Sequence, residues 1–95
     1  MGMTEVTLTG QLICATPVEA ERVRKALDAH IAATRAEPGC LSFDVTATEN
    51  PLVWQVDERF ETPAAFEAHQ ARAGASTWAV ETKGIQRDYT IRGMP

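Results

Sequence analysis

Four short stretches of this chain alternate apolar and polar residues, and a Thr-Pro pair follows the first and the third stretch. A period of two is typical of strands that bury one face. Thr16-Pro17 and Thr62-Pro63 each place a capping residue before a proline that suits the first helical position. The pattern therefore predicts the element order βαββαβ. The strands are expected over residues 6–14, 41–48, 52–60 and 86–92.

The first helix is expected over residues 17–35, where apolar residues recur at helical spacing. Glu37-Pro38-Gly39 then ends it, because proline cannot continue the helical hydrogen bonds and glycine suits a tight return. His30 lies beside the apolar stripe, so a solvated or helix-end role is favoured over a functional one. Residues 74–84 either continue the second helix after a kink or start a short helix of their own. We favour the broken helix.

The element order predicts one α+β domain over residues 1–95 with the ferredoxin-like plan. In that plan a four-stranded antiparallel sheet carries both helices on one face, and the apolar strand faces meet the helices. The opposite sheet face mixes polar and apolar side chains, so it is either wet or paired with another sheet. Gly10 interrupts the apolar face of the first strand and marks a bulge, a bend or a close approach by another group.

Charge and composition exclude several classes of function. The net charge of -4 and the pI near 5.0 argue against nucleic-acid binding, which needs clustered Lys and Arg. The chain opens without a secretory signal pattern and has no apolar run of the ~20 residues that a membrane helix needs, so we expect a cytoplasmic protein. Cys14 and Cys40 lack the spacing of a metal site. We expect two reduced thiols, with a disulfide or a reactive thiol as the alternative.

Most familiar catalytic plans are missing from the sequence. It has two histidines, no metal-ligand cluster, no glycine-rich phosphate loop and no Gly-x-Ser-x-Gly motif, so we expect no metal. What remains is a predicted pocket between helices and sheet, lined by aromatic side chains with one or two polar groups. Such a pocket suits a flat hydrophobic ligand better than a charged one.

His69 and Glu58 are the candidate catalytic residues. The imidazole of His69 titrates near neutral pH and could exchange a phenolic proton, with a structural hydrogen bond as the alternative. Glu58 points inward on its strand, where it would either orient His69 or close a structural network. Six aromatic side chains could stack against an aromatic substrate, with core packing as the alternative. They are Phe43, Trp54, Phe60, Phe66, Trp78 and Tyr89.

Three segments carry a resemblance to a known family: Glu37–Val45, Trp54–Phe60 and Phe66–His69. They resemble the signature of the antibiotic biosynthesis monooxygenase family of small dimeric α+β barrels. The resemblance implies a homodimer whose two sheets pack face to face, with Ile13 and Val53 as expected dry contacts. It also implies chemistry without a cofactor. Proteins that look like this include enzymes that oxidise polycyclic phenols or quinols, where the substrate anion reacts directly with molecular oxygen.

We therefore expect a cofactor-independent, monooxygenase-like protein that acts on a small phenolic or quinone-type aromatic substrate, with His69 assisting proton transfer. An isomerase or cyclase on the same scaffold is one alternative, and a non-catalytic ligand-binding protein is another. A closed apolar cavity touched by His69 would favour the enzyme. Glu58 and His69 buried and mutually satisfied, with no cavity beside them, would favour the binding protein.

Overall fold

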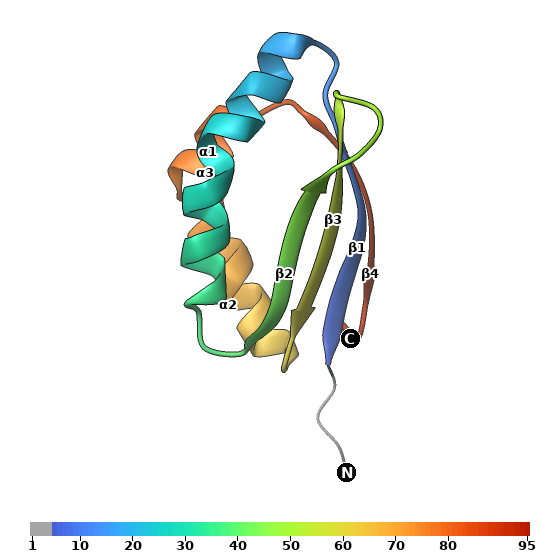
Figure 1. Ribbon diagram of the computed structural model, residues 1–95. Helices are drawn as coiled ribbons and strands as arrows, with labels where there is room; N and C mark the ends of the chain where they lie inside the picture. The colour runs from blue at the N-terminus through green and yellow to red at the C-terminus, as the bar shows by residue number, and fades with distance from the viewer. Residues whose placement is uncertain (1–4) are drawn as a thin grey trace.

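The chain folds into two layers, with the helices packed on one face of a four-stranded antiparallel sheet (Figure 1). A computed structural model describes residues 5–95 of the chain. The predicted order of strands and helices is confirmed, and one short helix is added before the last strand. The elements are β1 (Val6–Ile13), α1 (Pro17–Arg35), β2 (Cys40–Ala47), β3 (Val53–Phe60), α2 (Pro63–Gly74), α3 (Thr77–Glu81) and β4 (Gln86–Arg92).

The strand order of the sheet is β2-β3-β1-β4, with every neighbouring pair antiparallel. This order confirms the predicted ferredoxin-like fold class. Gly10 of β1 lies opposite Tyr89 of β4. A Cβ atom at Gly10 would lie 2.0 Å from the Asp88 carbonyl oxygen, so the strand glycine permits a close approach of the two backbones.

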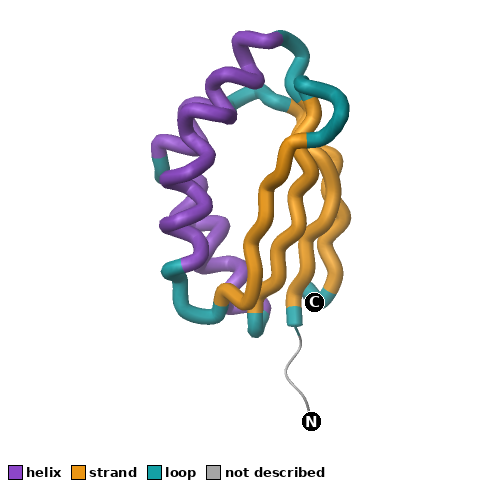
Figure 2. Tube along the Cα trace, in the orientation of Figure 1, coloured by secondary structure: helices purple, strands orange, loops and turns teal. Residues whose placement is uncertain are grey.

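The apolar faces of the strands turn toward the helices, and the core lies between the two layers. Figure 2 shows the helices and the strands as these separate layers. Leu12, Phe43 and Val56 are among its buried members. Leu41 was expected to share this face but is 45% exposed. The register of β2 on β3 shifts between Cys40 and Ser42, and this bulge turns Leu41 outward.

Both Thr-Pro pairs start helices as predicted. The Thr16 hydroxyl accepts a hydrogen bond from the Glu19 N–H at 3.2 Å, and the Thr62 hydroxyl accepts one from the Ala65 N–H at 3.1 Å. The predicted break after the second helix is also present, because α2 ends at Gly74 and the separate helix α3 begins three residues later, at Thr77. This break lets α3 lie against α1.

The other face of the sheet carries no helix (Figure 1). Its exposed side chains are polar, as in Thr9 and Gln11, while Ile13 and Val53 are half-buried and directly paired across β1 and β3. Cys14, directly after β1, and Cys40, the first residue of β2, are free cysteines. Within residues 5–95, no helix has the length and apolar character needed to cross a membrane.

Candidate functional site

A pocket of about 290 Å³ lies between the helices and the sheet and is partly open to solvent. It brings together five of the residues that the sequence singled out: Phe43, Glu58, His69, Trp78 and Tyr89. The expected cavity beside His69 is therefore present, although it is not closed.

Three other predicted aromatic residues lie outside this pocket. Phe60 is fully buried and Phe66 is 4% exposed, and their rings pack edge to face at 5.7 Å in the core. Trp54 is paired with Leu12 of β1, beyond the pocket-lining part of β3, and packs against the core. These three side chains have the core-packing role that the sequence left as the alternative.

His69 is held by Glu37, a residue that the sequence assigned only to a turn. The His69 side chain is 3% exposed, and its Nδ1 lies 2.8 Å from the Glu37 Oε1. A carboxylate only accepts hydrogen bonds, so this contact places the imidazole proton on Nδ1 and leaves the Nε2 lone pair free. Burial lowers the pKa of His69, and the hydrogen bond that its Nδ1–H donates to Glu37 opposes that effect.

Glu58 faces the free nitrogen of His69 from β3. Its Oε1 lies 3.9 Å from the His69 Nε2 and has no hydrogen-bond partner within residues 5–95. Burial, followed by repulsion from Glu37, raises the pKa of Glu58 to about 7. Glu37, not Glu58, is thus the carboxylate hydrogen-bonded to His69, so the expected orienting role belongs to Glu37. The expected closed network around Glu58 is not formed at this oxygen.

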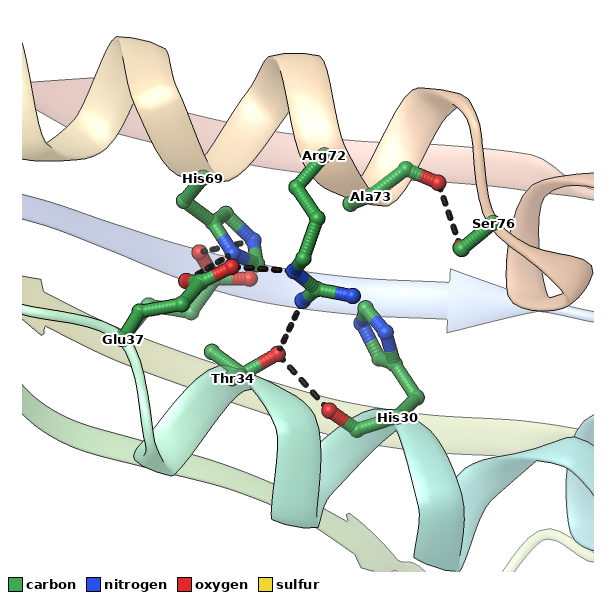
Figure 3. A network of polar contacts seen from close by, with 8 residues as sticks. His30, Thr34, Glu37, His69, Arg72, Ala73 and Ser76 are labelled. Atoms are coloured by element: carbon green, nitrogen blue, oxygen red, sulfur yellow. Dashed lines mark hydrogen bonds and ion pairs between the residues drawn. The ribbon is translucent and has the colours of Figure 1, made fainter.

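Glu37 also joins the ends of two helices (Figure 3). The Arg72 Nε donates to its second carboxylate oxygen, and the Arg72 Nη2 donates to the Thr34 hydroxyl at 3.0 Å. Thr34 is fully buried and donates in turn to the His30 carbonyl at 2.7 Å. Sequence reasoning missed this network. Its one local signal is that Arg72 follows His69 by three residues, which places both on one face of α2.

His30 was expected to be solvated or to serve the end of α1, and this expectation is wrong. The side chain is 6% exposed, lines the pocket, and stacks on the Trp78 ring with centroids 4.3 Å apart. Burial lowers the pKa of His30 to about 4, so its imidazole is neutral at neutral pH. The separate helix α3 creates this position, because it carries Trp78 onto the face of α1 that bears His30.

Tyr89 closes the β4 side of the pocket. Burial raises the pKa of its hydroxyl to about 12, so it stays protonated at neutral pH. Within residues 5–95, no three His, Cys, Asp or Glu side chains are grouped as a metal ion would need. The site therefore offers aromatic faces, neutral imidazoles and a carboxyl group of raised pKa, which together suit proton exchange with a flat ligand.

The sequence profile described as "Antibiotic biosynthesis monooxygenase" matches residues 11–80, which include Glu37, Glu58 and His69. This chain belongs to the antibiotic biosynthesis monooxygenase family. No curated protein matches it significantly.

Solved structures share the family fold across nearly the whole chain. PA3566 from Pseudomonas aeruginosa is 25% identical, with a TM-score of 0.75 over 96% of this chain and 92% of its own. A protein from Nitrosomonas europaea, provisionally named an antibiotic biosynthesis monooxygenase, is 22% identical, with a TM-score of 0.76 over 98% and 91%. Rv0793 from Mycobacterium tuberculosis is 22% identical, with a TM-score of 0.71 over 92% and 91%.

Proposed function

We propose that this protein is a cofactor-independent monooxygenase that oxidises a small phenolic or quinol-type aromatic substrate with molecular oxygen. The observation that carries the proposal is the state of His69 in the pocket. Glu37 fixes the ring and its proton at Nδ1, and the free Nε2 faces the pocket-lining Glu58. Family membership is consistent with this chemistry.

His69 acts as the general base in the first step. Its Nε2 takes the proton of a substrate hydroxyl, and the Glu37 carboxylate at 2.8 Å stabilises the imidazolium that forms. Burial of His69 keeps the ring neutral before the reaction, which is the state that accepts a proton. Glu58, whose pKa lies at about 7, is placed to exchange a proton with the same nitrogen.

The electron-rich substrate anion then reduces oxygen directly. One electron passes from the anion to O₂, and the resulting radical and superoxide combine to form a carbon–oxygen bond. The peroxide anion takes up the proton that His69 holds, and the resulting hydroperoxide loses water as the ring becomes a quinone. One oxygen atom of O₂ enters the product, the other leaves in water, and the substrate loses two hydrogens. The pocket's part is to hold the ring between Phe43, Trp78 and Tyr89 while the proton moves.

Oxygen uptake with a panel of hydroquinones, naphthols and anthrones tests the proposal, with ¹⁸O₂ as the gas. We expect uptake by the parent protein and one labelled oxygen atom in the product. His69→Ala should lower the rate at least about a hundredfold, the usual contribution of a positioned base. Glu67→Gln, an exposed change on the same helix, should leave the rate unchanged.

No uptake by the parent, or equal rates in the parent and His69→Ala, would remove the proposal. A product of unchanged mass would instead indicate an isomerase or cyclase. A purely structural role for Glu58 and His69 would need the two groups to satisfy each other with no cavity beside them. The 3.9 Å separation and the adjoining pocket favour the enzyme over the non-catalytic alternative.

A further inference from the structure

Arg87 is a charged residue of the pocket that the mechanism above does not use. It lies on β4, and its guanidinium is tied to the turn before that strand. The Nη1 donates to the carbonyl oxygens of Thr82 at 3.1 Å and Ile85 at 3.0 Å, and the Nη2 donates to the Thr82 hydroxyl at 2.7 Å. Thr82 is fully buried and Ile85 is 5% exposed, so these anchors are rigid.

The charge of Arg87 is not neutralised by an acidic side chain. No carboxylate within residues 5–95 forms an ion pair with it, whereas Arg72 is paired with Glu37. Its hydrogen bonds to Thr82 and Ile85 go to neutral oxygens and use three of the five guanidinium N–H groups. A fixed guanidinium with free donors is suited to bind a carboxylate or another planar oxyanion.

Arg87 and Glu58 lie at opposite ends of the pocket. Leu8 pairs with both Glu58 and Ile91, so Glu58 is level with Ile91, four residues along β4 from Arg87. Four residues of a strand span about 13 Å. The other titratable groups of the lining, His30, His69 and Tyr89, are neutral at neutral pH because burial shifts each pKa away from the charged form.

We propose that Arg87 is a specificity-determining residue that selects aromatic substrates carrying an anionic group at the end of the molecule opposite the reacting hydroxyl. This inference rests on the proposed function, because it takes the substrate hydroxyl to lie at His69 and Glu58, where the proton is transferred. The anionic group of the substrate then lies beside the Arg87 guanidinium and away from the Glu58 carboxyl group. A volume of about 290 Å³ accommodates a substrate of two or three fused rings in this orientation.

Calorimetric titration with a matched pair of ligands tests the inference without requiring turnover. The pair is 6-hydroxy-2-naphthoate and its neutral methyl ester. We expect the acid to bind at least about tenfold more tightly, as a charge-assisted hydrogen bond provides. Arg87→Gln keeps an amide donor for Thr82 and should abolish this preference. Arg92→Gln, a change of an exposed arginine on the same strand that does not line the pocket, should keep it.

A salt titration of the unaltered protein covers the case in which Arg87→Gln fails to fold. The affinity for the acid should fall as salt rises, while the affinity for the ester stays constant. Equal affinities for acid and ester, no binding of either, or a preference that survives in Arg87→Gln would overturn the inference. Selective binding of the acid without oxygen uptake would refute the monooxygenase proposal alone. Oxygen uptake from neutral quinols without this preference would refute only the role of Arg87.

Discussion

The Glu58 side chain is buried, with 7% of its surface exposed to solvent. Its ordinary pKa of 4.5 rises to about 7 in the folded protein. Between these two pH values the folded protein holds a proton that the unfolded chain has released. The contribution of Glu58 to the free energy of unfolding is therefore fully present below pH 4.5 and is lost as the pH rises through 7. His30 acts in the opposite sense between pH 4 and 6.5, because burial lowers its pKa.

Replacing the Glu58 carboxyl group by an amide should remove this loss of stability at high pH. We expect Glu58→Gln to be more stable than the parent at pH 8 by on the order of 2 kcal/mol, since one pKa unit corresponds to about 1.4 kcal/mol. The difference should shrink toward pH 5. Urea unfolding at a series of pH values measures it, with the exposed Glu67→Gln as control. A stability difference that does not change with pH would contradict the raised pKa.

The turn after α1 positions α2, and with it His69. Gly39 adopts a φ of 86°, and a Cβ atom there would lie 2.6 Å from the Cβ of Ala65 on α2. Glu37, two residues earlier, reaches His69 and Arg72 on the same helix. The turn and α2 are thus packed together, so a change in the distance between them should displace His69.

Gly39→Ala and Gly84→Ala form a matched pair that isolates this packing. Both glycines have a similar positive φ, of 86° and 84°, so both changes carry the backbone cost of about 1 kcal/mol. Nothing lies within 4 Å of a Cβ at Gly84. We expect Gly39→Ala to lower the free energy of unfolding by a further 1–3 kcal/mol, roughly the cost of overpacking, and to reduce oxygen uptake. Thermal unfolding compares the two. An equal loss of stability in the two variants would mean that α2 shifts to accommodate the added methyl group at no cost.

At the scale of the whole molecule, the bare face of the sheet is the expected contact for a second copy. Family members are commonly dimeric. On this face the half-buried Ile13 and Val53 are direct partners at one end of the β1–β3 register, and polar side chains such as Thr9 and Gln11 follow along the strand. Protein interfaces usually combine apolar contacts with polar ones. We therefore infer a homodimer through this face.

Ile13→Lys should convert this dimer to a monomer, because it buries a charge in the apolar part of the contact. We expect light scattering after gel filtration to give twice the 10.4 kDa chain mass for the parent and the single mass for the variant. Val18→Lys changes an exposed residue of α1, 63% accessible, and should leave the dimer intact. A monomeric parent, or a dimer that survives Ile13→Lys, would exclude this face as the interface.

The order of elements was predictable from the sequence because it depends on local chemistry. Alternation along the strands, the caps of Thr16 and Thr62 and the turn at Gly39 each act within a few residues, and all are present in the structure. The inward direction of Glu58 followed from the same alternation. Leu41 departed from it, because a register shift depends on the pairing partner as well as on the strand itself.

The composition of the site was decided by the tertiary structure. Glu37 and His69 are far apart in the chain, and their contact depends on how the end of α1 meets α2. His30 is buried because Trp78 of α3 stacks on it while Phe43 and His69 lie beside it. Periodicity tells which face of an element is apolar, but the distance between two faces depends on the packing of all the elements together. Sequence alone therefore determined the fold and the inward carboxyl group, and only packing selected the partners of the proposed base.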